Sequence, residues 1–299
     1  MARKAKSSRP DAGGNAPVEA PAPPAPEPAK EPAPDAASAG PEKEKAPPAA
    51  PEGEKVPAAH LTNCLVCGQE LVYFGEHRKL ECFYCKETVD GNAQCAAGHF
   101  VCDRCHGLEA AALIEQFCLR TDLTDPLELA ATLMRNPAVK MHGPEHHYMV
   151  PAVLLTAYYN KRKLKDRKPE KLAEARKRAA NVPGGFCGFY GDCGAAVGTG
   201  IFVSLLTGAT PLSKKEWRLS NLMTATALTK IAELGGPRCC KRNTFLALQE
   251  AIKFVEEHFG TKLETAWAGK CGMSEHNKEC LLEECPFFGQ SKREHSAPW

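Results

Sequence analysis

Seven cysteines and one histidine lie between residues 64 and 105 at spacings typical of metal ligands. Three C-x-x-C pairs occur there (CLVC, CFYC and CDRC), and a further cysteine and the histidine precede the last pair. Each C-x-x-C turn can direct two thiolates at one metal ion, and four such ligands complete a tetrahedral zinc shell. The sequence therefore predicts two closed, structural zinc sites made by Cys64, Cys67, Cys82, Cys85, Cys95, His99, Cys102 and Cys105.

The spacing leaves the pairing of these ligands open. Sequential pairing gives a four-cysteine site followed by a site of three cysteines and His99, whereas a cross-braced pairing interleaves the same eight residues. His106 is an alternative nitrogen ligand to His99. Zinc is the expected metal because thiolate tetrads of this spacing usually hold it, and iron in a rubredoxin-like site is the alternative.

The segment between the first two pairs predicts a short β-hairpin. Leu71, Tyr73 and Leu80 flank Gly75-Glu76, a turn signal, so a C-x-x-C pair would stand at each end. We therefore expect a small zinc-ribbon-like module over residues 60–106. A segment this short cannot bury enough apolar surface to fold alone, and structural zinc, contributing roughly 10–16 kcal/mol, would make up the deficit.

Residues 1–58 are rich in Ala, Pro, Glu and Lys and predict a disordered tail, because they offer almost nothing apolar to bury. The net charge of +2 does not indicate a nucleic-acid partner. No apolar run is long enough for a membrane span, and the N-terminus does not resemble a secretory signal. The fifteen cysteines therefore favour metal or thiol chemistry over disulfides, with the cytoplasm as the expected location.

From residue 107 to 289 the apolar pattern predicts an all-helical domain, so the chain as a whole is expected to be mainly α. Asp125-Pro126 and Pro144 are helix starts, and Pro151 predicts a kink. The segment CGAAVGTGIFVSLLTG is apolar all round and reads as a buried helix. Capping boxes at Ser213 and Thr261 predict two further helix starts, and the glycines at 235 and 260 predict two helix ends.

Cysteines, histidines and basic residues gather at the predicted breaks between helices, where helical bundles often build their sites. The candidates for a site in this domain are His142, His146, His147, Cys187, Cys193, Cys239 and Cys240. A helix N-terminus with Arg238, Lys241 and Arg242 nearby would favour thiolate at Cys239 or Cys240. The alternative is that these side chains are ordinary capping and core residues, and that the small residues 194–200 serve close helix packing. The sequence assigns no role to Cys271, Cys280 and Cys285.

Three strings, MHGPEHHYMVPAVLL, CGFYGDCGAAVGTGIF and LGGPRCCKRNTF, resemble the prokaryotic family called domain of unknown function 5714, over about residues 61–288. The segment CGAAVGTGIFVSLLTG is also similar to the GCAxxG pattern of small redox proteins. The first resemblance implies a metal or redox role beside radical S-adenosylmethionine or methyltransferase domains, to which members are sometimes fused. This chain has no C-x-x-x-C-x-x-C radical motif, so such a partner would be a separate polypeptide.

Three functions follow as hypotheses. The first is a metal-binding protein with structural zinc and a redox, metal-handling or sulfur-handling site in the helical domain, holding an iron–sulfur cluster, a second metal or a disulfide. It would assist a radical S-adenosylmethionine or methyltransferase enzyme. The second is a non-catalytic adaptor whose zinc module recruits a protein partner. The third is a transferase that binds a small molecule near His142 to His147.

Overall fold

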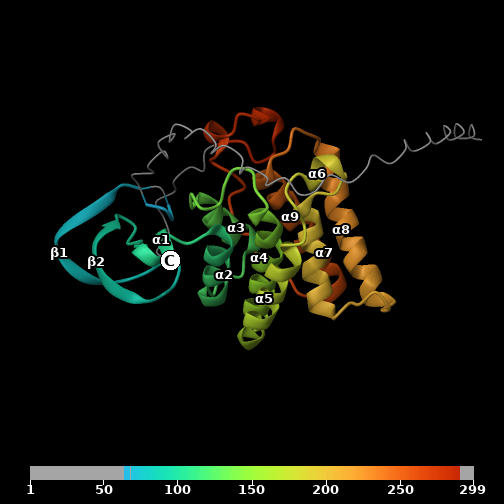
Figure 1. Ribbon diagram of the computed structural model, residues 1–299, viewed down its shortest axis with the longest axis horizontal. Coiled ribbons are helices and arrows are strands. Elements are labelled where there is room, and N and C mark those ends of the chain that lie inside the picture. Colours follow the sequence, from blue (N-terminus) through green and yellow to red (C-terminus); the bar gives the residue numbers. More distant parts are fainter. Residues whose placement is uncertain (1–63, 68, 290–299) are drawn as a thin grey trace, which may run out of the picture. The chain divides into compact units, whose positions relative to one another are not determined.

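The computed structural model describes residues 64–67 and 69–289, and the tail predicted for residues 1–58 lies outside them. The described part is mainly helical, with one two-stranded antiparallel sheet (Figure 1). No helix in this part of the chain has the length and apolar character needed to cross a membrane. The strands and helices are β1 (Leu71–Glu81), β2 (Thr88–Cys95), α1 (Asp103–His106), α2 (Ala110–Arg120), α3 (Pro126–Arg135), α4 (Glu145–Lys161), α5 (Lys168–Ala179), α6 (Phe186–Phe189), α7 (Gly194–Thr207), α8 (Lys215–Leu234) and α9 (Cys240–Phe259).

Several helix ends lie where the sequence predicts them. Asp125 is the N-cap of α3, and its carboxylate accepts hydrogen bonds from the next turn, at 2.8 Å from Leu127 N. Gly235 follows α8, and Gly260 ends α9 in the left-handed conformation. The helix start predicted at Ser213 is confirmed, since α8 begins at Lys215, although the Ser213 hydroxyl accepts from Thr210 N and does not cap the helix. The second capping-box prediction is wrong, because no helix begins at Thr261.

Helix α4 is the centre of the helical domain, in contact with α2, α3, α5, α7 and α9. Figure 1 shows it between α2 and α7. Its hydrophobic residues are buried around most of its circumference, as expected of a helix surrounded by others. This helix therefore fixes the positions of the chain segments on either side of it.

The small residues of α7 allow neighbouring helices to approach closely. A Cβ atom at Gly198 would stand 2.9 Å from Pro151 Cδ and 3.0 Å from the His147 carbonyl oxygen, both in α4. A Cβ atom at Gly200 would stand 2.0 Å from Thr224 Oγ1 in α8. Contacts this short leave no room for a side chain, so these glycines serve helix packing.

Gly198→Leu is expected to lower the free energy of unfolding by about 1–3 kcal/mol, because the added side chain must push α7 away from α4. Urea denaturation measures the change. Gly188→Leu in α6 is the matched control, since a Cβ atom there meets nothing within 4 Å. Equal stability of the two variants would contradict the packing argument.

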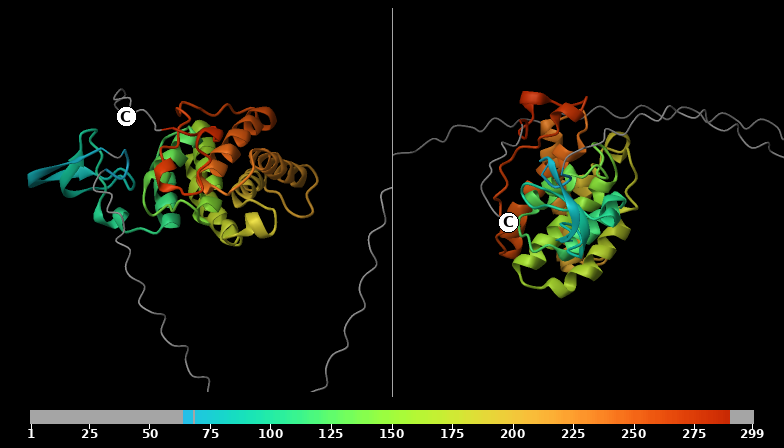
Figure 2. Two further views of the ribbon diagram at one scale, coloured as in Figure 1. Left: turned by 90° about the horizontal axis from the view of Figure 1, so that it is seen from above. Right: turned by 90° about the vertical axis from the view of Figure 1, so that its left-hand side faces the viewer.

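The hairpin predicted around Gly75 is wrong in the position of its turn. Strand β1 continues through Gly75 and pairs with β2, from Leu71 opposite Cys95 to Glu81 opposite Thr88 (Figure 2). Four residues of β1, 74–77, lie opposite a single residue of β2, residue 92. This irregularity is a β-bulge, and a bulge bends the strand that contains it. The turn of the hairpin is the CFYC loop, so one C-x-x-C pair stands at the turn and the other at the open end.

Candidate metal centres

Two groups of side chains in the N-terminal module can each hold a metal ion. Cys64, Cys67, Cys95 and His99 form the first, and Cys82, Cys85, Cys102 and Cys105 form the second. Within each group the ligand atoms all lie within 4.8 Å of one another. The pairing is thus cross-braced, with the first C-x-x-C pair joining the third ligand pair and the second joining the fourth. His99 supplies the nitrogen atom of the first group, and His106 belongs to neither group.

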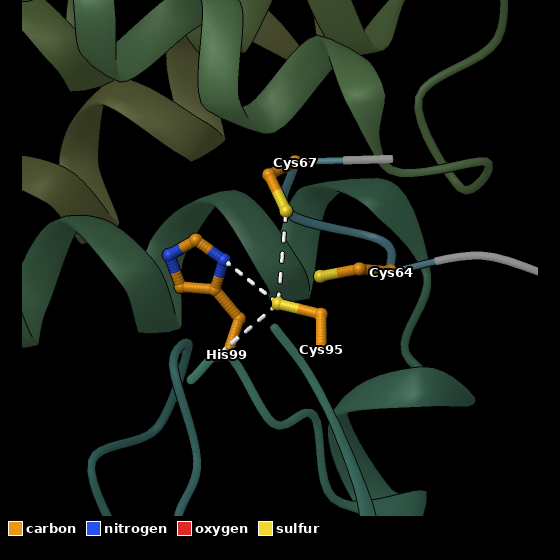
Figure 3. A group of neighbouring side chains, drawn as sticks. All are labelled: Cys64, Cys67, Cys95 and His99. Carbon is orange, nitrogen blue, oxygen red and sulfur yellow. Dashed lines mark hydrogen bonds between the residues drawn. The ribbon is translucent and has the colours of Figure 1, made fainter. Parts of the chain in front are cut away.

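The hairpin register explains this pairing. Because Leu71 lies opposite Cys95, the end of β2 comes beside the first C-x-x-C loop, and Cys67 Sγ lies 3.7 Å from Cys95 Sγ. Figure 3 shows the side chains of the first group pointing toward one another. At the other end of the hairpin, Phe83 N donates to Phe100 O at 2.8 Å, which brings the CFYC loop beside the last ligand pair.

The sulfur positions suit tetrahedral zinc. Two sulfurs that each lie about 2.3 Å from a tetrahedral zinc ion are about 3.8 Å apart. Two pairs match this distance: Cys67 and Cys95 Sγ are 3.7 Å apart, and Cys85 and Cys102 Sγ are 3.8 Å apart. Backbone N–H groups also donate to ligand sulfurs, at 3.4 Å from Val66 N to Cys64 Sγ, as in many metal–thiolate sites.

Burial is the main influence on the pKa values of several of these candidate ligands. Burial raises the pKa of Cys64 to about 12 and raises that of Cys105 further. Burial also opposes ionisation of Cys85, but hydrogen bonds from the Glu87 N–H and from neighbouring thiols outweigh it and lower the pKa to about 7. The pKa of His99 is lowered by burial, which keeps its imidazole neutral and able to bind metal. A bound cation would favour all four thiolates of the second group, so metal binding should release protons.

Helix α2 contacts the metal module through its buried face. The Phe117 ring stacks on Phe83, with centroids 5.6 Å apart, and meets the Tyr84 ring edge-on. Arg120 donates to the Cys85 carbonyl oxygen. Tyr84 in turn donates to the Leu65 carbonyl oxygen, so both C-x-x-C loops connect to the helix through one aromatic cluster.

The three candidate histidines have different environments. His146 is buried with both nitrogens hydrogen-bonded, to Thr244 Oγ1 and to the Lys140 carbonyl oxygen, and burial lowers its pKa to about 3. His147 donates from Nδ1 to the Val182 carbonyl oxygen, and its ring packs on Gly194. His142 is half-buried, with Nε2 3.1 Å from Asn277 Oδ1 and 3.3 Å from Glu279 Oε2.

The structure separates the candidate cysteines. Cys193 and Cys240 are neighbours: Asn243 Nδ2 donates to Cys193 Sγ at 3.5 Å, and a charge on Cys193 would raise the pKa of Cys240. Cys187 lies in α6, and Cys239 faces a different group. Burial raises the pKa of Cys239 and raises that of Cys240 to about 11. The predicted preference for thiolate at these two positions is therefore wrong, because desolvation outweighs the nearby positive charges.

Cys239 instead lines a narrow hollow, partly open to solvent, together with Cys271, Cys280 and Cys285. Sequence reasoning left these three cysteines without a role. Their spacings, with eight and four residues between them, match no C-x-x-C turn, and the fourth thiol comes from a helix start 32 positions earlier. Only the fold brings them together.

A comparison with protein families matches residues 114–288 to the Family of unknown function (DUF5714). The match lies within the helical domain and begins after the metal module. It therefore covers fewer residues than the resemblance noted in the sequence, which extends over about residues 61–288. No curated protein and no solved structure matches the chain. Since the matched residues make up more than half of its length and include His142 to His147, the glycine-rich start of α7 and the start of α9, the chain belongs to this family of unknown function.

Proposed function

We propose that this is a metal-binding protein whose two cysteine-rich groups hold structural zinc ions and whose helical domain carries redox, metal-handling or sulfur-handling chemistry. Four protein ligands fill a tetrahedral zinc shell, so neither group leaves a coordination position for a substrate. The zinc ions would hold the module together, and the chemistry is assigned to the thiols of the helical domain.

The observation that carries this proposal is the gathering of six cysteines around the first turn of α9. Cys239 and Cys240 are the N-cap and first residue of that helix. One faces the hollow lined by three further thiols, and the other neighbours Cys193. Thiols gathered around one helix turn can hold a metal group between them or, after movement of the chain, exchange between dithiol and disulfide.

An accessory role fits the chain better than a complete enzyme does. The sequence lacks the C-x-x-x-C-x-x-C motif, so radical chemistry would belong to another polypeptide. We propose that the protein assists a partner enzyme, either a radical S-adenosylmethionine enzyme or a methyltransferase.

Thiol alkylation under anaerobic conditions tests the assignment. The six thiols around α9 are expected to react slowly in the protein as isolated and rapidly after chelation or reduction, because a metal or a disulfide protects them. Cys118, fully buried in α2, is the internal control and should stay slow throughout. Uniformly slow labelling in all conditions, with no metal bound outside the module, would show that the six thiols are inert core residues. That result would contradict the redox or metal-handling role.

A non-catalytic adaptor is the second candidate, and the metal module favours it. Val72 and Tyr73 on β1 are 51% and 70% exposed, so they offer apolar contact area to a partner. Binding of a partner that is lost on Tyr73→Ser, but unaffected by oxidation of the helical domain, would favour the adaptor over the redox role.

A further inference from the structure

The hollow beside α9 has the composition of a metal-group site rather than of a substrate pocket. Four of its lining residues are cysteines, contributed by the start of α9 and by the segment that follows the helix (red in Figure 1). Leu281 and Phe287 are among the apolar residues that line it, and no carboxylate does. Sulfur ligands in a mostly apolar shell are the surroundings that metal–thiolate groups use.

Backbone N–H groups hold each of these thiols in place. The N–H of the residue two positions later donates to three of them, and that of the third residue donates to Cys239. The contacts are Met273 N to Cys271 Sγ at 3.5 Å, Leu282 N to Cys280 Sγ at 3.4 Å, Phe287 N to Cys285 Sγ, and Arg242 N to Cys239 Sγ at 3.5 Å. The same contact occurs in the zinc module between Val66 N and Cys64 Sγ. Such donors stabilise thiolate and orient it toward a metal.

The four thiols are too far apart for a single ion. In the described part of the chain, only the two groups of the N-terminal module have three or more ligand atoms within 4.8 Å of one another. No three of the thiols at 239, 271, 280 and 285 meet that condition, although all four line one hollow. A group with several metal atoms separates its ligands in this way, because each thiolate binds a different corner of it.

Positive charge is available for an anionic group at this site. Four thiolates around an iron–sulfur cluster carry more negative charge than the metal cancels. Lys241 and Arg242 both line the hollow, and both are 3% exposed. Arg242 Nη1 is buried without a hydrogen-bond partner, so it has a donor free for a sulfur atom. An Asn277 amide also donates to Cys239 Sγ, at 3.6 Å.

The chain around the hollow has little regular structure of its own. After α9 ends at Phe259, residues 260–289 contain only two three-residue 3-10 helices, Ser274–His276 and Leu282–Glu284. The Phe245 ring of α9 stacks on the Trp267 ring, with centroids 4.2 Å apart, and both rings contact the Phe287 ring. These contacts attach the segment to α9 at two points, one before and one after its three cysteines. An irregular segment of this length in a compact domain is usually functional, and a metal group would fix the part that holds the cysteines.

We propose that Cys239, Cys271, Cys280 and Cys285 bind a 4Fe–4S cluster, with one thiolate on each iron. The separation of the thiols favours a cluster over a single zinc or iron ion, and four thiolates match the four irons of this cluster. The inference rests on the proposed function, since it names the metal group that the helical domain would use.

The test uses the full chain, isolated anaerobically or reconstituted with ferrous iron, sulfide and a thiol reductant. About four iron and four acid-labile sulfide per chain are expected, beside the zinc of the module, with visible charge-transfer absorption that dithionite bleaches. Cys271→Ser and Cys280→Ser should each lower iron and sulfide severalfold, while Cys187→Ser, outside the hollow, should not. Unchanged zinc content and far-ultraviolet circular dichroism would show that the variants fold.

The possible failures are distinguishable. A third zinc with no iron or sulfide would overturn the cluster but keep a metal site in the helical domain. About two iron and two sulfide per chain would overturn its nuclearity. Absence of any metal with reversible disulfide formation would overturn the cluster and leave the redox role, whereas absence of metal with inert thiols would overturn both. The wild-type iron and sulfide content decides the question even if a variant aggregates.

Discussion

Replacing Cys82 with alanine is expected to unfold the metal module and leave the helical domain folded. Cys82 is fully buried and belongs to the four-cysteine group. Structural zinc contributes roughly 10–16 kcal/mol in zinc-finger peptides, more than a module with so small an apolar core can replace. Zinc should fall from about two ions per chain to one or fewer, the count set by four ligands per ion. The module contains no tryptophan, whereas Trp217 and Trp267 belong to the helical domain, so fluorescence reports the helical domain separately.

Cys118→Ala is the matched control, because it removes a buried thiol that binds no metal, and it should keep both zinc ions. Retention of two ions by Cys82→Ala would contradict the assignment.

The variant Cys64→Ala tests how the ligands are paired. In the cross-braced module, Cys67 and Cys95 should be the first thiols to react with an alkylating agent. Sequential pairing would instead release Cys82 and Cys85.

The candidate ligands of the metal module could be predicted from the sequence, but the way in which the structure groups them could not. Ligand identity follows from residue type and spacing along the chain. Pairing depends on which strand positions face each other, and that register is set by the bulge at residues 74–77. Gly75-Glu76 is a turn signal and predicts a hairpin tip, but a glycine inside a strand can equally mark a bulge, as it does here. The metal loop, with Cys82 N bonded to Glu87 O at 2.9 Å, makes the turn instead.

In the helical domain, periodicity predicted the helices, while the site depended on tertiary contacts. The ends of α8 and α9 follow from Gly235 and Gly260, whose positive φ angles suit glycine. Cys239 and Cys240 were equivalent in the sequence, but the first turn of α9 points them into different surroundings. Burial also reversed the expected shift of their pKa values, because a sequence shows neighbouring charges without showing desolvation.

Lowering the pH from 6.5 to 5 is expected to destabilise the helical domain by about 1.6 kcal/mol through His146 alone, with the slope approaching about 1.4 kcal/mol per pH unit below pH 6. Burial lowers the pKa of this histidine from 6.5 to about 3 in the folded protein. Above pH 6.5 the imidazole is neutral in both states, so its contribution is fully present. Below pH 6.5 the unfolded chain binds a proton that the folded chain excludes, and the free energy of unfolding falls until the pH approaches 3.

Urea denaturation followed by tryptophan fluorescence, at several pH values, measures this slope against that of His146→Gln. The glutamine amide can still accept from Thr244 and donate to the Lys140 carbonyl oxygen, but it cannot titrate. Protonation of zinc ligands affects both proteins equally, so it cancels in the difference. Lys241, whose pKa burial lowers to about 8, titrates above this range. The wild-type slope should therefore be steeper than that of the variant between pH 6.5 and 5, and equal slopes would mean that the buried imidazole accepts a proton in the folded domain.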